Sequence, residues 1–207
     1  MGLLRLLMNN PVAFILIAVP LMYAIIFHEL AHGYVAYRLG DPTAKSLGRL
    51  SLNPLKHLDP LGTLMLFLVG FGWAKPVPVN FSYIRDSRKG IILVSSAGII
   101  MNIMMAFLAL LLYSLLNPPQ SSILALVLYF FAKINIILAA FNLIPIPPLD
   151  GSKILLGFSP PSVQALLLRL ERFGFLIVIV LLYLGVLNPV IDFLQRVILS
   201  LINALLP

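Results

Sequence analysis

Three apolar stretches, each long enough to cross a lipid bilayer, constrain the fold of this chain more than any other feature. They cover residues 11–39, 91–116 and 123–144. A helix needs roughly 20 apolar residues to span the hydrocarbon core, where every backbone polar group must be satisfied internally. Hydrophobic residues make up 61% of the 207 residues and charged residues only 10%, which leaves no room for a folded soluble domain. The sequence therefore predicts an all-α polytopic membrane protein.

Three further segments complete the predicted fold of about four transmembrane helices. Residues 61–72 are apolar but too short to span, and the glycines and prolines of residues 70–80 predict a re-entrant, β-hairpin-like segment. Residues 176–187 form a fourth, somewhat short, crossing. Beyond Asn188 and Pro189, polar and apolar residues recur at helical spacing. This pattern predicts a C-terminal amphipathic helix that lies in the interface or packs on the bundle.

The basic residues are distributed unevenly along the chain. Of 14 basic residues, eight lie between the first and second long helices and three between the third and fourth. Positive charge marks cytoplasmic loops, so we expect both of these connections to face the cytoplasm. The basic residues form no long run and no patch with interleaved aromatics, and we expect no nucleic-acid partner. Lys133 lies near the middle of the third long helix, where a charge is costly unless it reaches water, a partner or a lipid head group.

The first apolar stretch contains the sequence His28-Glu29-Leu30-Ala31-His32. Residues four apart lie on one face of a helix, so the two imidazoles can bind one zinc ion. Glu29 lies off that line but within reach of a metal-bound water, where a general base must sit. The alternative is a hydrogen-bonded polar cluster without metal. Because burying an unpartnered carboxylate in an apolar segment costs several kcal/mol, we favour the metal site.

A catalytic zinc normally takes three protein ligands and leaves a fourth position for water. With no cysteine in the chain, the third ligand must come from the few remaining acids and histidines. Asp150 follows the proline-broken segment 142–149, which can carry a carboxylate to membrane depth, although Asp150-Gly151 can equally be an interfacial turn. His57 and Asp59 are rival ligands, but their loop position favours a surface turn.

These motifs together resemble the site-2 protease family of intramembrane zinc metalloproteases. The resemblance rests on the motif 28–32 and on Pro145-Ile146-Pro147-Pro148-Leu149-Asp150-Gly151, and it extends over residues 13–157, with Ile99 where the family usually has proline. It is closest to the small prokaryotic branch without PDZ or CBS domains. The resemblance implies that one zinc ion per chain is bound by His28, His32 and Asp150. It also implies that Glu29 is the catalytic base and that Asn102 and Asn142 help hold substrate.

The resemblance also implies what such a protein does and where. It implies a single metalloprotease domain over residues 1–207, with a catalytic core at about 11–157 and C-terminal helices at about 162–206. Its substrates would be transmembrane proteins of the cell membrane, cleaved near the cytoplasmic side in regulated intramembrane proteolysis. A metal transporter would need further acidic or histidine residues along a path, and the chain has only three histidines and seven acids. A catalytically silent scaffold would not need Glu29. The sequence leaves the oligomeric state and the physiological substrate open.

Overall fold

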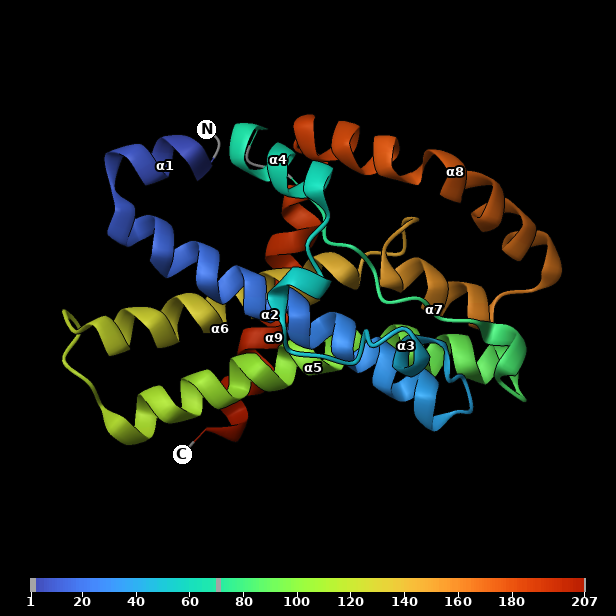
Figure 1. The fold of residues 1–207 in the computed structure, drawn as a ribbon, viewed down its shortest axis with the longest axis horizontal. Helices are drawn as coiled ribbons and strands as arrows, with labels where there is room; N and C mark the ends of the chain where they lie inside the picture. Colours follow the sequence, from blue (N-terminus) through green and yellow to red (C-terminus); the bar gives the residue numbers. More distant parts are fainter. Residues whose placement is uncertain (1–2, 70–71, 207) are drawn as a thin grey trace.

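Three long helices pack together at the centre of the structure. The structure is a computed structural model that describes residues 3–69 and 72–206. Helices α2 (Pro11–Arg38), α5 (Ser87–Leu116) and α6 (Ile123–Asn142) pack against one another in all three pairings (Figure 1). Each of these helices is long and apolar enough to cross a membrane. The three predicted long helices are therefore confirmed, and the protein is a multi-pass membrane protein.

Local sequence signals set the ends of these helices. The Asn10 side chain accepts a hydrogen bond from the backbone N–H of Ala13, and Pro11 occupies the first turn of α2. In the same way, Asp86 accepts from Lys89 at the start of α5, and Ser122 caps the start of α6. Each cap satisfies a backbone donor that has no partner within its helix.

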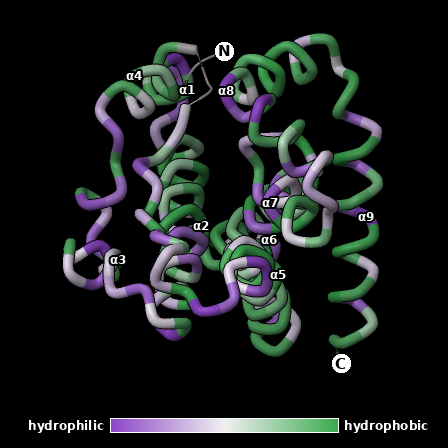
Figure 2. The backbone as a smooth tube through the Cα atoms, turned by 90° about the vertical axis from the view of Figure 1, so that its right-hand side faces the viewer, coloured by the Kyte–Doolittle hydropathy of each residue, from purple (hydrophilic) through white to green (hydrophobic). Residues whose placement is uncertain are grey.

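A shared apolar core joins α5 and α6 to the C-terminal helix α9 (Asn188–Leu205). Its buried members are Ile99, Ala106, Ile136, Ala139, Ala140, Ile198 and Ile202. Alanines at the α5–α6 interface let the two backbones approach closely, which is the usual basis of helix packing in membranes. Figures 1 and 2 show α9 running crosswise to α5 and α6. The core therefore fixes α9 across the middle of the bundle.

The remaining elements are shorter or peripheral. They are α1 (Leu3–Asn9), α3 (Thr43–Ser46), η1 (Pro54–Lys56), α4 (Pro60–Val69), η2 (Phe81–Tyr83), α7 (Asp150–Phe158) and α8 (Pro161–Tyr183). Helices α8 and α9 form a pair bent by 90°, which counts as a fourth span only if the pair is taken as one broken crossing. The predicted fourth crossing at residues 176–187 covers the end of α8 and the turn before α9, and α8 alone is not a candidate span. Figure 2 shows hydrophobic residues along most of the long helices and a hydrophilic stretch around α3.

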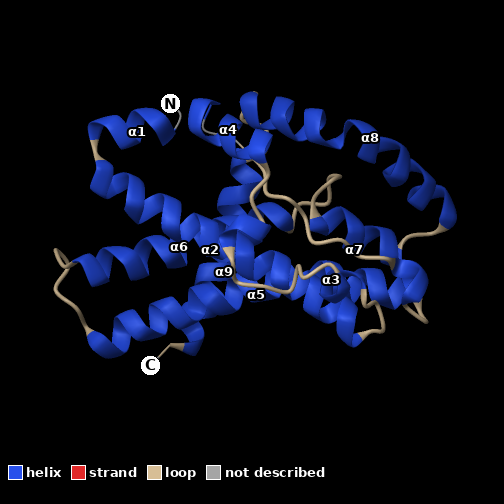
Figure 3. Cartoon of the chain, viewed as in Figure 1, coloured by secondary structure: helices blue, strands red, loops and turns tan. Residues whose placement is uncertain are grey.

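The prediction of a β-hairpin-like segment is not supported. Figure 3 shows helices and loops but no strand among the residues that the structure describes. Pro60 starts α4, and the Leu, Met and Phe residues that follow favour a helix where we expected a re-entrant hairpin. Residues 72–80, here called the strap, make only one isolated bridge, between Ala74 and Leu58. Pro76 and Pro78 lack the N–H groups that a β-ladder requires; Gly70 and Phe71, part of the same prediction, lie outside the described residues.

Candidate metal centre

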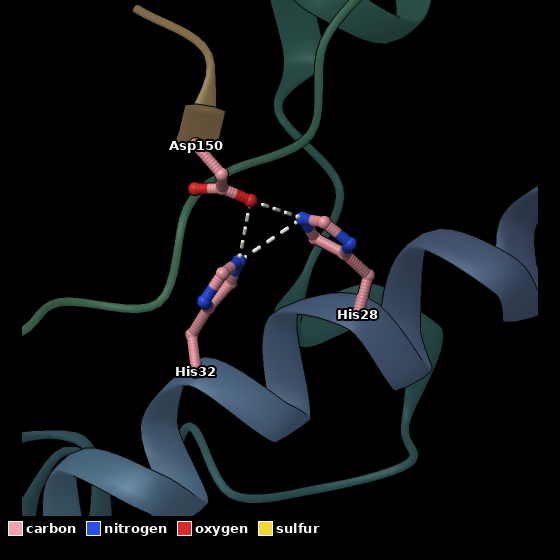
Figure 4. Close-up of side chains that lie close together, drawn as sticks. All are labelled: His28, His32 and Asp150. Atoms are coloured by element: carbon pink, nitrogen blue, oxygen red, sulfur yellow. Dashed lines mark hydrogen bonds and ion pairs between the residues drawn. The ribbon is translucent and has the colours of Figure 1, made fainter. Parts of the chain in front are cut away.

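Two imidazoles of α2 and one carboxylate at the start of α7 converge (Figure 4). The Nε2 atoms of His28 and His32 lie 3.0 Å apart, and each is 3.1 Å from Oδ2 of Asp150. All three side chains are buried. Apart from the two imidazole nitrogens, Oδ2 of Asp150 has no hydrogen-bond partner among the described residues. Two nitrogen atoms and one oxygen atom, each able to ligate a metal ion, therefore face one another within one buried space.

Two elements that are far apart in the sequence bring these side chains together. His28 and His32 are one turn apart on α2 and share a face because of the 3.6-residue helical period. Asp150 is the first residue of α7, directly after the turn of residues 143–149 that follows α6. Within that turn, the N–H of Leu149 donates to the carbonyl of Ile146, and the Pro147-Pro148 bond is cis. The turn delivers Asp150 to the histidines at the depth of the long helices.

Hydrogen bonds from α5 fix the tautomers of both histidines. Nδ1 of His28 lies 2.6 Å from Oδ1 of Asn102, whose amide nitrogen donates to the carbonyl oxygen of Ala24. Because that carbonyl can only accept, the Asn102 orientation is fixed, and Nδ1 of His28 must carry the proton. Nδ1 of His32 likewise donates to the carbonyl of Val94 at 2.6 Å. Both Nε2 atoms therefore present lone pairs to the shared space, which is the arrangement of metal-ligating histidines.

The network continues one residue further to a side chain on α6. Asn135 is fully buried, its Oδ1 accepts from the amide nitrogen of Asn102 at 2.8 Å, and its own amide donates to the carbonyl of Phe131. Sequence reasoning missed Asn135. An amide side chain within an apolar helix was the signal that could have found it, since such residues are costly unless they are bonded. Asn135 on α6 thus helps to hold Asn102, which in turn holds His28.

A glycine on α5 makes room for the imidazoles. A Cβ atom at Gly98 would lie within 3.0 Å of Nε2 of His32 and of two ring atoms of His28. Real side chains do not approach this closely, so any other residue at this position would displace both rings. Gly98 is therefore a steric requirement of the centre.

The donor set fits zinc. Tetrahedral zinc with bonds of roughly 2.0–2.1 Å separates its ligand atoms by about 3.3 Å, close to the three distances observed here. Two neutral imidazoles and one carboxylate also match the ligand types of hydrolytic zinc sites. With both Nδ1 protons donated to α5, the two Nε2 lone pairs and the carboxylate oxygen have no proton to share between them. A cation in the shared space satisfies all three atoms, so the donor set is arranged for a metal ion.

Glu29 lies beside this centre and is held by the strap. Its Oε2 accepts a hydrogen bond of 2.8 Å from the backbone N–H of Val77. Gly33, one residue after His32, lets the strap approach α2, because a Cβ at Gly33 would lie 2.7 Å from the Val77 side chain. The strap therefore sets the position of the Glu29 carboxylate.

The strap is in turn held by a buried arginine that sequence reasoning did not single out. Nη2 of Arg49 donates to the carbonyls of Lys75 at 2.7 Å and Pro76 at 3.2 Å, directly before Val77. Only 9% of Arg49 is exposed. One arginine in a polar loop gives no sequence signal of such a role, because its partners are backbone carbonyls. Arg49, the strap and Glu29 form one connected chain of hydrogen bonds.

Asp41 anchors the far end of the strap. Its carboxylate is fully buried and accepts from the backbone N–H of Asn80 at 2.7 Å and from both the N–H and the hydroxyl of Thr43. Burial raises the pKa of Asp41, but these hydrogen bonds outweigh it, and the pKa lies below its ordinary value. The charged form of Asp41 therefore stabilises the folded state.

Replacing Asp41 by asparagine should lower the free energy of unfolding at neutral pH by roughly 1.5–3 kcal/mol, the value of hydrogen bonds to a charged group. Because the pKa of Asp41 is lower in the folded than in the unfolded state, its charge stabilises the fold at pH values above the unfolded pKa of about 3.9. This stabilisation is lost as the pH falls through the folded-state pKa. Thermal unfolding of the detergent-solubilised protein at pH 6 and pH 3 measures this. The gap between wild type and Asp41→Asn should shrink at pH 3, and a gap independent of pH would contradict the role of the charge.

The other residues singled out in the sequence lie elsewhere. His57 is buried, with Nε2 bonded to the carbonyl of Ser51, and Oδ1 of Asp59 accepts from the N–H of Gly62 at the start of α4. The structure brings neither into the group formed by His28, His32 and Asp150.

The two asparagines with a predicted substrate role lie in different places. The amide nitrogen of Asn142 donates a hydrogen bond to the carbonyl of Leu138 in its own helix. Asn102 lies at the centre itself, fully buried. The substrate roles of Asn102 and Asn142 stay predictions.

Apolar helices around a buried pair of imidazoles and a carboxylate define a helical membrane protein with a candidate hydrolytic metal site.

Similarity to known proteins supports this class of membrane metalloenzyme. Peptidase family M50 matches residues 117–185, a range that includes Asp150. YwhC of Bacillus subtilis is 42% identical over 172 residues, which cover 80% of this chain and 78% of YwhC. Rip2 of Mycolicibacterium smegmatis is 33% identical over 181 residues, covering 84% of this chain and 69% of Rip2. Both are named, provisionally, as zinc metalloproteases, and no solved structure gives a significant match.

The chain belongs to peptidase family M50, the site-2 protease family. It is a zinc metalloprotease of the membrane. The family resemblance seen in the sequence is thereby confirmed, and so is the assignment as an enzyme.

Proposed function

We propose that this protein hydrolyses peptide bonds within or near the transmembrane segments of other membrane proteins, as a step in regulated intramembrane proteolysis. The observation that carries the proposal is the convergence of Nε2 of His28, Nε2 of His32 and Oδ2 of Asp150 between membrane-spanning helices. Because two of the three atoms belong to a candidate membrane span, we expect a peptide bond to reach this centre at membrane depth. We assign one zinc ion per chain to these three ligands.

The chemistry divides between the ion and the side chains. Zinc, when bound, acts as a Lewis acid that acidifies water and polarises a peptide carbonyl. Glu29 is the general base: its carboxylate takes a proton from the attacking water and returns it to the leaving amine nitrogen. The N–H of Val77 holds Oε2, which leaves Oε1 for the proton. Asn102 positions His28 by accepting a hydrogen bond from its Nδ1–H.

The strap supports a binding mode for an extended substrate. A transmembrane helix must unwind before its carbonyls can be attacked, because they are already hydrogen-bonded. Val77 and Val79 are on one edge of the strap, and within the described residues neither the carbonyl of Val77 nor the N–H of Val79 has a hydrogen bond. Both groups can pair with an extended peptide, as in β-augmentation. The Oδ1 atom of Asn142 can accept from a further peptide N–H.

The setting of the reaction follows from the charge distribution. Eleven of the 14 basic residues lie in the two loops that we assign to the cytoplasm. Asp150 follows the cytoplasmic end of α6 in that orientation, so we place the active site nearer the cytoplasmic side of the plasma membrane. We treat residues 1–207 as one domain, with a catalytic core at about 11–157 and C-terminal helices at about 162–206.

A reconstituted cleavage assay tests the proposal. The probe is a fluorescently tagged single-span protein whose transmembrane segment carries an Asn-Pro pair, placed with the enzyme in the same liposomes. We expect cleavage inside the segment, located by mass spectrometry, and at least tenfold slower cleavage when polyleucine replaces the segment, because polyleucine does not unwind. Cleavage confined to the soluble part of the probe would contradict intramembrane proteolysis.

Replacing Arg49 by methionine should lower kcat about tenfold or more while zinc content stays at the wild-type level. The strap carbonyls would lose their donor, and Val77 would no longer hold Glu29 in place. Lys56→Met is the matched control, because Lys56 is an exposed cation that also donates to a backbone carbonyl, that of Gly48. Equal effects of the two substitutions, or loss of zinc in Arg49→Met, would show that Arg49 does not act through Glu29.

A further inference from the structure

A cavity lies between α5, α6 and α9, on a side of α6 that Asn135 and the metal centre do not use. Its volume is about 380 Å³, within the roughly 300–1,000 Å³ of small-molecule sites. Its polar lining comes from Tyr129 and Lys133 of α6 and from Asp192, Gln195 and Arg196 of α9; Leu110, Ala132, Ile136 and Leu199 supply the apolar part. The cavity is thus a space with charged groups set in apolar walls.

The charged groups of the cavity are unpaired within the part of the chain that the structure describes. Among the residues that the structure describes, Lys133, Asp192 and Arg196 form no ion pair within 4.0 Å, and the Lys133 ammonium lies over the Tyr129 ring, 5.8 Å from its centre. Lys133 belongs to a candidate membrane span, where an unpaired charge is costly. Two cations against one anion give the cavity a net positive charge. The cavity is therefore complementary to a ligand with one negative charge.

The arrangement of charged and apolar side chains around the cavity indicates an amphipathic ligand. Helix α9 packs Ile198 and Ile202 into the core, while Asp192, Gln195 and Arg196 line the cavity beside them. A ligand bound there would meet cations at one part of its surface and leucine and isoleucine side chains at another. Basic pockets between transmembrane helices near the cytoplasmic side bind anionic lipid head groups, and the long side chains of exposed residues such as Lys133 extend their charge toward the head-group level. A phosphodiester carries one negative charge, and Asp192 disfavours a second.

We propose that the cavity between α5, α6 and α9 binds an anionic phospholipid. Lys133 and Arg196 bind the phosphate, the Gln195 amide donates to a head-group oxygen, and an acyl chain runs along Leu110, Ile136 and Leu199. The lipid supplies a counter-charge to Lys133, which forms no ion pair with any residue in ranges 3–69 and 72–206. This site is separate from the proposed protease chemistry and does not depend on it.

Lipid binding to the full-length protein in detergent tests the proposal. Delipidated wild type is titrated with phosphatidylglycerol, phosphatidylcholine or inorganic phosphate, and binding is read from native mass spectrometry and from the shift in Tm. We expect phosphatidylglycerol to bind and raise Tm, with affinity at least tenfold weaker in Lys133→Met and Arg196→Met, from the value of a charged hydrogen bond. Asp192→Asn should bind as tightly as wild type or more tightly. Arg169→Met, which removes an exposed cation from α8, is the matched control.

Each alternative result overturns the proposal. Equal binding of phosphatidylcholine and phosphatidylglycerol would show that the cations do not select an anionic lipid. A shift produced equally by inorganic phosphate would identify a free-anion site. Unchanged affinity in Lys133→Met and Arg196→Met, both of which change exposed side chains, would place the lipid elsewhere on the protein. Equal weakening in Arg169→Met would reveal a general effect of surface charge.

Discussion

Glu29→Gln is expected to lower kcat for peptide hydrolysis by about 10²–10⁴-fold, the usual contribution of a general base. Glutamine keeps the shape of the side chain and an oxygen that can accept from the N–H of Val77, so the strap should stay in place. It cannot take a proton from water at neutral pH. Zinc content and Tm should therefore remain at wild-type values, while cleavage of the single-span probe falls.

The control for this substitution is Glu171→Gln. Glu171 is an exposed carboxylate on α8, and its replacement removes the same charge away from the metal centre. It should leave kcat within about twofold of wild type, as surface substitutions generally have small effects. Full activity in Glu29→Gln would remove Glu29 from the mechanism, and a loss of zinc would mean that Glu29 supports the metal centre instead.

Gly98→Ala is expected to lower zinc affinity by more than about 100-fold, beyond the usual loss from a disturbed support of the ligands. The new methyl group would lie within 3.0 Å of both imidazole rings, which would have to move away from Asp150. Alanine favours a helix more than glycine does, so the effect on α5 itself should be favourable. Zinc per chain and kcat should fall together in this variant.

Gly90→Ala provides the same chemical change on the same helix. The added methyl group would meet the side chain of Ile84 and not the imidazoles. We expect a modest loss of Tm with zinc content unchanged. Zinc loss of the same size in both variants would show that the effect of Gly98→Ala is a general disturbance of α5.

Sequence reasoning placed the long helices and the ligand candidates for clear physical reasons. A bilayer requires long apolar helices, so residues 91–116 and 123–144 were recognisable from length and hydropathy alone. His28 and His32 were recognisable because a four-residue spacing puts them on one helical face. Asp150 was only one of several possible ligands from the residues themselves, and the family resemblance selected it. The structure brings it within 3.1 Å of both imidazoles.

The features that were missed depend on contacts between distant segments. Arg49 bonds backbone carbonyls 26 and 27 residues away, and such partners leave no pattern in side-chain chemistry. The hairpin prediction gave too much weight to glycine and proline at residues 70–80 and too little to the helix-forming residues of α4. Asn135 was visible as a polar residue in an apolar helix but gained meaning only from its contact with Asn102. Local patterns thus gave the elements, and tertiary packing gave their connections.

Zinc per chain in the detergent-purified protein tests the central claim most directly. Wild type, His28→Ala and Asp150→Ala are compared by elemental analysis, with circular dichroism to show that each is folded. We predict close to one zinc ion per chain in wild type and at least a tenfold loss in both variants, since each removes one of three ligands. A folded wild type that takes up no zinc, or variants that retain it, would contradict the assignment of His28, His32 and Asp150 as the metal centre.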